Sequence, residues 1–505
     1  APLFSVYSES SVGIADFSDL NLLGQICKKM GSSILQLLPL NDSGYGFMPY
    51  DSQSSFALDP MYLPLSNAEG VDFDSFQPSI RDLKNMFPID PYRVNYGIKA
   101  KKMELLWNVF QASKDSLADR GFLEYRKNNS YWVEDYALFK VLQQVTGKHD
   151  WQEWSHEYRD RDQNLLSRFS EEHSESLLFH IWLQYLCFRS LNGVRSSLNQ
   201  SGILLMGDLP FLVSRSSADV WAFRECFKLE LSSGAPPDYF LAAGQRWGMP
   251  PYDWNRLKSD DYRYIQSKLA YASNFYNMYR IDHAIGLFRV WTIKNTEPFE
   301  SAGLNGVFDP PNESEWQQHG EQLFRMMLHA SDMLPCAEDL GMVPACSEPT
   351  LARLGIPGME VYRWTEENDH TPSSREQYRL IASAVLSTHD TLPVSQWWHD
   401  LSDEERQTRA RHLGLPGADV PYAEVLKKSF EFISETASVF TIHSIQDVLN
   451  LTSPESQEHC MRNINYPGTF GDMNWTWRCP VPLEKWAEHS GFNFLRDINE
   501  RTGRI

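Results

Sequence analysis

The sequence predicts an α/β fold, a barrel of parallel strands with largely helical and loop insertions. Apolar residues at helical spacing alternate along the chain with short apolar runs. These runs are too apolar to leave one face of a sheet in water, and several end in a carboxylate. A length of 505 residues fits one large barrel with insertions. An open doubly wound sheet would also align strand ends, but no glycine-rich phosphate motif follows any run.

The first helix and the first strand are predicted close to the start of the chain. After Ser18-Asp19, apolar side chains recur at helical spacing over 20–30 and Gly31 ends the pattern. The run 34–38 follows, and Pro39 stops it. We therefore predict a helix followed directly by a buried strand.

Four further helix–strand pairs follow the same order. In three of them an apolar stripe precedes a short apolar run: 181–191 before 203–208, 265–275 before 278–282, and 316–327 before 333–338. In the fourth, the spacing Ser373-x-x-Glu376 has the form of a capping box and is expected to open a helix that leads to a strand within 384–390.

These four strands end in acidic residues, namely Asp208, Asp282, Glu338 and Asp390. In a parallel α/β barrel the active site is built at the carboxyl ends of the strands, so these side chains are expected to meet in one cavity. The simpler alternative is that each acid only begins a loop or caps the next helix. Because two of the four stand beside a histidine, we favour the shared site.

Two segments interrupt the alternation of helices and strands. Residues 66–161 carry helical patterns around 102–110 and 132–142, and we predict a mainly helical insertion there. Residues 214–254 are rich in Pro, Gly and aromatic side chains, and we predict a second insertion that lines the active-site cleft. The chain 1–505 is otherwise expected to form a single catalytic unit. The aromatic residues of the second insertion are Trp221, Phe223, Tyr239, Phe240, Trp247, Tyr252 and Trp254.

Composition and charge exclude several classes of function. The formal net charge of −20 disfavours nonspecific nucleic-acid binding, and no stretch approaches ~18 uninterrupted apolar residues, so no membrane span is expected. The seven scattered cysteines form no CxxC pair, and the opening residues lack the pattern of a signal peptide, so we expect a cytoplasmic protein with reduced thiols. The chain does not open with Met, and we expect residues upstream of Ala1 to have been trimmed.

The grouped carboxylates are best suited to glycosyl transfer. No DxDxD cluster, HExxH motif or Cys/His spacing indicates a metal, no GxSxG elbow indicates a serine nucleophile, and no cofactor is expected. Glycosyl transfer needs one ionised carboxylate as nucleophile and one carboxylic acid as proton donor. Arg280 lies two residues before Asp282 on the same face of a strand and favours its ionised form, whereas the apolar strand before Glu338 favours a protonated acid. The aromatic content of 13% is compatible with sugar platforms but does not by itself indicate them.

The chain resembles glycoside hydrolase family 77, the 4-alpha-glucanotransferases of the amylomaltase or disproportionating-enzyme type. The resemblance extends from the amino-terminal SVGIADFSD to NINYPGTFGDMNWTWR near the end. Its most specific motifs are YRIDH (279–283), AEDLG (337–341) and STHD (387–390), in that order. Further matching blocks are LQLLPLNDSGYGFMPY (35–50), GDLPFLVSRSSADVW (207–221), PPDYFLAAGQRWG (236–248) and GIPGME (355–360).

The resemblance implies a (β/α)8 TIM barrel with helical insertions. It also implies a retaining, double-displacement transfer of α-1,4-glucan segments, without metal or cofactor. The donors would be maltodextrin, glycogen or starch chains, and the acceptor the 4-hydroxyl of a glucan or of glucose. It implies that Asp282 is the nucleophile, that Glu338 is the acid/base and that Asp390 grips the distorted sugar. It also implies substrate-binding roles for Arg280, His283, His389, Asp208, Tyr45, Tyr50, Trp247 and Asn465.

Some positions depart from the family pattern, and two other functions stay open. Met48, Met249, Ile285 and Thr391 stand where other residues are usual, which leads us to expect altered subsite affinity or chain-length preference. An α-glucan hydrolase with a leakier acceptor site would carry the same carboxylates. A glucan-binding protein without catalytic activity would not require all three carboxylates Asp282, Glu338 and Asp390.

Overall fold

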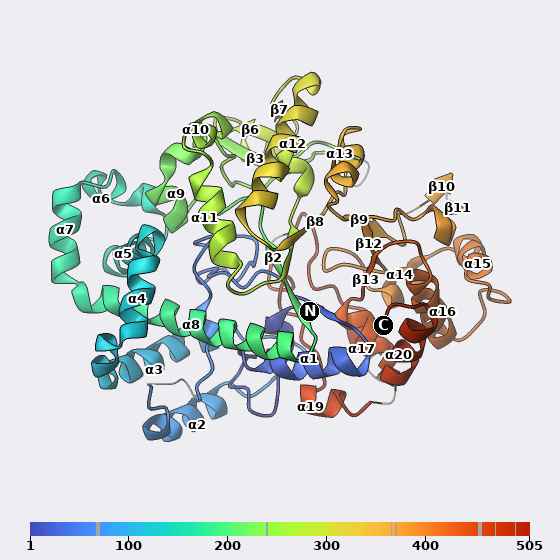
Figure 1. Cartoon of the computed structure of the whole chain (residues 1–505), viewed down its shortest axis with the longest axis horizontal. Helices are drawn as coiled ribbons and strands as arrows, with labels where there is room; N and C mark the ends of the chain where they lie inside the picture. The colour runs from blue at the N-terminus through green and yellow to red at the C-terminus, as the bar shows by residue number, and fades with distance from the viewer. Residues whose placement is uncertain are drawn as a thin grey trace.

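The computed structural model describes residues 1–66, 71–238, 241–364, 366–368, 371–452, 457–469, 471–489 and 491–505 (Figure 1). The predicted residues Tyr239 and Phe240 of the second insertion, and residues 67–70 of the first, lie outside these ranges. None of the helices within these ranges combines the length and the apolar character needed to cross a bilayer. All seven cysteines are free thiols.

Seven parallel strands form one series in the described part of the chain. Strands β1, β2, β5 and β8 are hydrogen-bonded neighbours in that order, as are β9, β12 and β13. The two groups join where the Ala337 N–H donates to the Pro357 carbonyl at 2.7 Å. The strands are β1 (Ile34–Gln36), β2 (Leu204–Leu209), β5 (Met278–Ile281), β8 (Leu334–Ala337), β9 (Gly358–Val361), β12 (Ala382–Val385) and β13 (Phe440–Ile442).

Helices precede the strands of this series, as the apolar stripes predict, except between β9 and β12, where the described residues form no α-helix. Helix α1 shows why: its buried residues Leu20, Leu23 and Cys27 fall on one face, and Gly31 follows it with φ +70°, a conformation that suits glycine. The helices of this kind are α1 (Asp19–Lys29), α8 (Ser174–Gln200), α11 (Arg263–Ala272), α12 (Glu313–Ala330), α13 (Ser347–Leu354), α14 (Val394–Asp400), α15 (Asp403–His412) and α16 (Tyr422–Ser434). The later helices are α17 (Ile445–Thr452), α18 (Gln457–Cys460), α19 (Leu483–Trp486) and α20 (Gly491–Arg501).

The helix predicted to begin at Ser373 is wrong. A capping box does form there, but one residue later, between Ser374 and Gln377. It caps only the short 3-10 turn Arg375–Gln377, after which the chain runs to β12. The capping residues therefore predicted the turn correctly. No α-helix forms after it because no apolar stripe of helical length follows in the sequence. Strands β10 (Glu366–Asn368) and β11 (Thr371–Pro372) form a small antiparallel pair just before it.

From residue 77 to α8 the chain is mostly helical, as drawn on the left of Figure 1. The helices there are α2 (Gln77–Met86), α3 (Ile98–Ala112), α4 (Arg120–Asn128), α5 (Ser130–Thr146), α6 (His156–Arg159) and α7 (Gln163–Glu172). After β2 come α9 (Ala218–Ala222), β3 (Leu231–Ala235), β4 (Gln245–Arg246) and α10 (Trp254–Ser259). Strands β4 and β3 join β6 (Val290–Lys294) and β7 (Val307–Asp309) in an antiparallel sheet at the top of Figure 1. The division into one catalytic unit and two insertions stays a prediction.

A small apolar cluster lies among the parallel strands. Its buried members are Met206 of β2, Met278 of β5 and Cys336 of β8, and Ile34 of β1 and Phe440 of β13 pack against them. Because side chains of alternate strands fill the interior of a barrel, this cluster is the inner core of the strand series. The larger apolar core packs the helices around the strands.

Candidate active site

One buried arginine binds three of the predicted carboxylates. Arg280 Nη1 lies 2.8 Å from both oxygens of Asp208 and 3.1 Å from Asp282 Oδ1. Its Nη2 lies 2.9 Å from Glu338 Oε2. Strand β5 makes this possible because it lies between β2, which carries Asp208 opposite Arg280, and β8, which leads into Glu338. Acidic side chains from separate strands therefore come together around Arg280, as the sequence predicts.

The backbone fixes the two acids that follow β5 and β8. The Asp282 N–H donates to the Leu209 carbonyl at 3.3 Å, and the Glu338 N–H donates to the Ile281 carbonyl at 3.1 Å. The His283 N–H in turn donates to Glu338 Oε2 at 2.7 Å. His283 adopts the left-handed conformation with φ 46°, which ends the strand and turns this N–H toward the acid. Burial lowers the pKa of its imidazole to about 4, so His283 is neutral at pH 7.

Asp390 follows β12 and belongs to a second set of polar side chains, separate from the contacts of Arg280. His389 Nε2 lies 3.2 Å from Asp390 Oδ2, and Asn465 Nδ2 donates to Asp390 Oδ1 at 2.6 Å. The backbone N–H of Asn465 also donates to the His389 carbonyl at 3.1 Å. Burial opposes ionisation of Asp390, but the charge and hydrogen bond of His389 outweigh it and bring the pKa of Asp390 to about 2. Asp390 is therefore a firmly ionised carboxylate.

Tyr50 joins the two groups. Its hydroxyl donates to Asp208 Oδ2 at 2.8 Å and lies 3.0 Å from His389 Nε2. Its ring also stacks on the His389 ring, with centroids 5.3 Å apart and an interplanar angle of 11°. Tyr50 therefore connects the side chains around Arg280 with those around Asp390, and together they form one site.

The expected surroundings of Asp282 and Glu338 need correction. Burial raises the pKa of Asp282 to about 8; Arg280 opposes the shift, and the nearby carboxylates add to it. The expectation that Arg280 keeps Asp282 ionised is wrong, because burial outweighs the effect of Arg280, which is shared among three carboxylates. Glu338 does not lie in the dry setting expected from its strand, since it pairs with Arg280 and accepts a backbone N–H.

The two remaining aromatic candidates differ. The Trp247 ring meets His283 edge to face with centroids 4.8 Å apart, so it lies beside the site. The Tyr45 side chain is 53% exposed and contacts Phe47 and Lys99. No contact within the described residues joins Tyr45 to the carboxylates.

Trp475 is a site residue that sequence reasoning did not single out. Its ring lies 5.6 Å from Tyr50 and 5.8 Å from His389, measured between centroids. It occurs ten residues after Asn465, inside the segment NINYPGTFGDMNWTWR. The position of Trp475 in this family-like segment was the one indication in the sequence that it could lie at the site. The segment contains two tryptophans, and the sequence alone does not show which of them faces the site.

The four departures from the family pattern lie around this site rather than on its acids. The Thr391 hydroxyl accepts the Thr388 N–H at 2.8 Å and so shapes the turn that carries Asp390. Ile285 is buried in the short turn after His283, and Met48 and Met249 pack partly buried against the core. Within the described ranges no cluster of His, Cys, Asp and Glu has the arrangement of a metal site. The expectation of no metal and no cofactor stays a prediction.

A buried charge network fixes the loop that carries Tyr45 and Tyr50. Asp42 binds Lys99 of α3 at 2.8 Å and Lys140 of α5 at 2.9 Å. Lys99 also binds Asp59 at 2.7 Å, at the far end of the same loop. Despite the cost of burial, the two lysines hold the pKa of the Asp42 carboxyl well below its usual range. Helices α3 and α5 therefore position the loop that carries Tyr50.

The chain is similar to known proteins over almost its whole length. A family model described as 4-alpha-glucanotransferase, glycoside hydrolase family 77, matches residues 1–483. A 4-alpha-glucanotransferase of Chlamydia pneumoniae is 36% identical over 501 residues, covering 97% of this chain and 93% of the relative. One of Thermus thermophilus is 30% identical, covering 95% and 93%. A solved amylomaltase of Streptococcus agalactiae in complex with acarbose superposes with a TM-score of 0.84 at 25% identity, covering 100% of this chain and 98% of that one. This likeness confirms the predicted barrel-type fold.

The Asp42 network can be tested by unfolding. We expect Asp42→Asn to lower the free energy of unfolding by about 3–5 kcal/mol, because it leaves two buried ammonium groups with one carboxylate. The matched control Glu104→Gln removes an exposed partner of Lys101 and should cost at most about 1 kcal/mol. Urea unfolding at pH 7 measures both. Equal stabilities of the two variants would contradict the role of Asp42.

Proposed function

Because the chain belongs to glycoside hydrolase family 77, the 4-alpha-glucanotransferases, we propose that it transfers α-1,4-glucan segments through a retaining reaction carried by Asp282, Glu338 and Asp390. The observation that supports this most strongly is the shared guanidinium of Arg280. It holds Asp282 and Glu338 close together, which favours the separation of about 5–5.5 Å typical of retaining enzymes.

In the proposed first step the donor chain is cleaved. An oxygen of Asp282 attacks the anomeric carbon, and the bond from that carbon to the glycosidic oxygen breaks. Glu338 gives its proton to the leaving oxygen, so the rest of the donor departs with a free 4-hydroxyl. Asp390, ionised and held by His389 and Asn465, accepts hydrogen bonds from the sugar hydroxyls.

In the second step an acceptor takes over the glycosyl group. Glu338 removes the proton from the acceptor 4-hydroxyl, the resulting oxygen attacks the anomeric carbon, and Asp282 leaves as a carboxylate. Transfer exceeds hydrolysis when a bound sugar is held in attack geometry and water is excluded. Trp247 beside His283 is suited to such an acceptor subsite, and we propose that the segments 66–161 and 214–254 form its walls.

The raised pKa of Asp282 fits a site in which this acid holds a proton before the reaction. Arg280 alone does not neutralise Asp208, Asp282 and Glu338 together, so a proton on Asp282 reduces the excess of negative charge. In the reactive form that proton belongs on Glu338, which frees Asp282 to attack. Substrate binding is proposed to select this form.

The substrate class follows from the family and from the aromatic and carboxylate lining. We propose maltodextrins, glycogen or starch chains as donors and a glucan or glucose as acceptor. The amylomaltase of Streptococcus agalactiae was solved with acarbose. The Asp390 carboxylate and the Tyr50 hydroxyl supply the polar contacts that an uncharged sugar needs.

Incubation with maltotriose tests the reaction and the roles together. Disproportionation should yield glucose and longer oligomers while the number of reducing ends stays constant. Asp282→Asn and Glu338→Gln should each lose at least ~10³-fold in turnover, because each removes a group that acts in the reaction. The control Asp497→Asn alters an exposed carboxylate of α20 and should retain the parent rate.

Two results would contradict this proposal. A steady growth of reducing ends would indicate a hydrolase instead. Retention of near-normal turnover by Asp282→Asn would refute its role as nucleophile.

The pH dependence tests the shared negative charge. Asp282 must be ionised to attack, so kcat/KM should fall as pH drops through its raised pKa of about 8. Asp208→Asn removes one negative charge and leaves Arg280 freer to favour ionised Asp282, so the acid limb should move to lower pH by about one unit. Asp497→Asn serves as the control with an unchanged profile. A shift to higher pH in Asp208→Asn would contradict the account.

A further inference from the structure

A second arginine binds the residue that directly follows the proposed acid/base. Asp339 comes after Glu338, and its side chain is only 1% exposed. Arg379 lies in the segment that leads to β12. Its Nη1 donates to Asp339 Oδ2 at 2.5 Å, and its Nη2 donates to Asp339 Oδ1 at 3.3 Å. The guanidinium therefore holds both oxygens of a buried carboxylate, which fixes the orientation of that carboxylate as well as its charge.

The same guanidinium also binds β9. Arg379 Nη2 donates to the Met359 carbonyl at 2.8 Å, and its Nε pairs with Glu360. Asp339 Oδ1 in turn accepts the Met359 N–H at 2.7 Å. Gly358 leaves room for these contacts, since a Cβ there would come within 2.6 Å of Asp339 Oδ2 and 2.7 Å of Arg379 Nη1. Arg379 thus ties the residue after Glu338 to β9.

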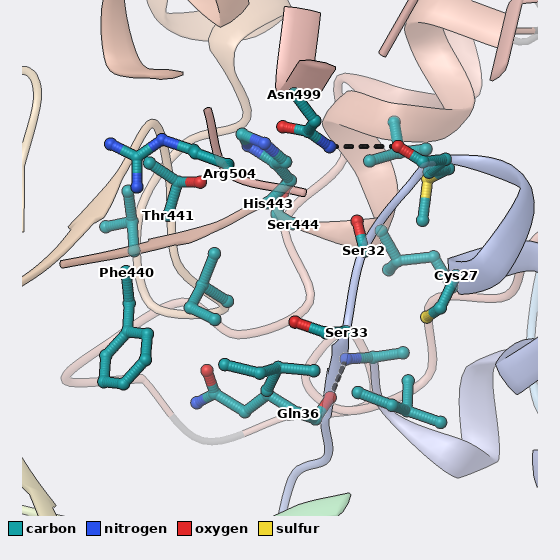
Figure 2. Close-up of a pocket in the computed structure, with 18 of the residues that line it drawn as sticks. Cys27, Ser32, Ser33, Gln36, Phe440, Thr441, His443, Ser444, Asn499 and Arg504 are labelled. Atoms are coloured by element: carbon teal, nitrogen blue, oxygen red, sulfur yellow. Dashed lines mark hydrogen bonds between the residues drawn. The ribbon is translucent and has the colours of Figure 1, made fainter. Parts of the chain in front are cut away.

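The main chain around Arg379 is held from the start of β13. Ser438 Oγ donates to the Arg379 carbonyl at 2.9 Å, and the Val439 N–H donates to the Leu380 carbonyl at 2.9 Å. These two donors directly precede Phe440, which begins β13 and lines the cavity shown in Figure 2. The neighbouring strand therefore sets the place from which the guanidinium reaches Asp339.

Glu338 is held by β5 and by the turn after it. Its N–H donates to the Ile281 carbonyl at 3.1 Å, and its carbonyl accepts the Ala284 N–H at 3.0 Å. Its side chain pairs with Arg280 of β5 at 2.9 Å. In an extended chain successive side chains point to opposite sides, which agrees with Glu338 facing β5 and Asp339 facing β9. A rotation of the main chain between these two acids would therefore displace both.

We propose that Arg379 is a positioning residue for the acid/base: by fixing Asp339 against β9, it fixes the main-chain rotation that sets the direction of the Glu338 side chain. This inference rests on the proposed role of Glu338 in proton transfer. A proton donor must lie about 2.6–3.2 Å from the oxygen that it protonates, so a small rotation is enough to impair it. Cleavage of a donor whose leaving group needs no proton should not respond to the same rotation.

The test compares two donors in Arg379→Met and Arg379→Lys. Cleavage of maltotriose needs the proton of Glu338, whereas the first turnover of α-maltosyl fluoride, measured as released fluoride, does not. Lysine keeps the charge, but its single ammonium cannot bind both oxygens of Asp339 as the planar guanidinium does. The matched control Arg353→Met removes an arginine of α13 that is 45% exposed and pairs with Glu321.

We expect Arg379→Met to lose about 10–100-fold of its kcat on maltotriose, because the acid is displaced rather than removed. Fluoride release in the first turnover should stay within about three-fold of the parent, which also shows that the site is folded. Arg379→Lys should show the same difference between donors with a smaller loss, and it decides the test if the methionine variant does not fold. Arg353→Met should match the parent with both donors.

An equal loss with both donors in the Arg379 variants, or no loss with either donor, would overturn the inference. Glu338→Gln separates this result from a failure of the proposed function. If Glu338→Gln loses only the reaction of maltotriose while the Arg379 variants show no such difference, only the positioning role is wrong. If Glu338→Gln loses both reactions equally, Glu338 is not the acid/base, and the inference is overturned together with the proposed function.

Discussion

The pairing of Arg280 with Asp208, Asp282 and Glu338 is the interaction on which this site depends. One guanidinium, almost fully buried on β5, faces carboxylates from β2, from its own strand and from the end of β8. Such charges lose hydration on burial and are tolerated because they are paired. Burial is the main cause of the raised pKa of Asp282, and the excess of negative charge that the pairing leaves adds to it. The contacts that position Asp282 therefore also act on its ionisation.

Contacts beyond the Arg280 group link it to Asp390 and to the helical segment before α8. Tyr50 connects Asp208 to His389 and so links the Arg280 group to Asp390. The loop that carries Tyr50 is held from the other side by Asp42, which binds lysines of α3 and α5. A helical segment remote from the chemistry therefore positions a residue inside it.

The sequence predicted the features that depend on the periodicity of apolar residues and on the acidic residues at strand ends. The helix over 19–29 and the meeting of Asp282, Glu338 and Asp390 follow from patterns that are local along the chain. Three features were missed or wrong, and two of them depend on tertiary contacts. The capping box at Ser374 has no apolar stripe behind it, so it caps only a short turn. The ionisation of Asp282 depends on neighbours from other strands, and the place of Trp475 depends on how a long final segment folds back.

In the proposed reaction Asp282 forms a bond to the sugar while Glu338 moves the proton. The most direct test treats Glu338→Gln with α-maltosyl fluoride, whose fluoride leaves without an acid, so the first step proceeds and the second lacks its base. Mass spectrometry of the digested protein should find one maltosyl group, located on the peptide that contains Asp282. A maltosyl group on a different residue, or none despite release of fluoride with inverted product, would contradict the account.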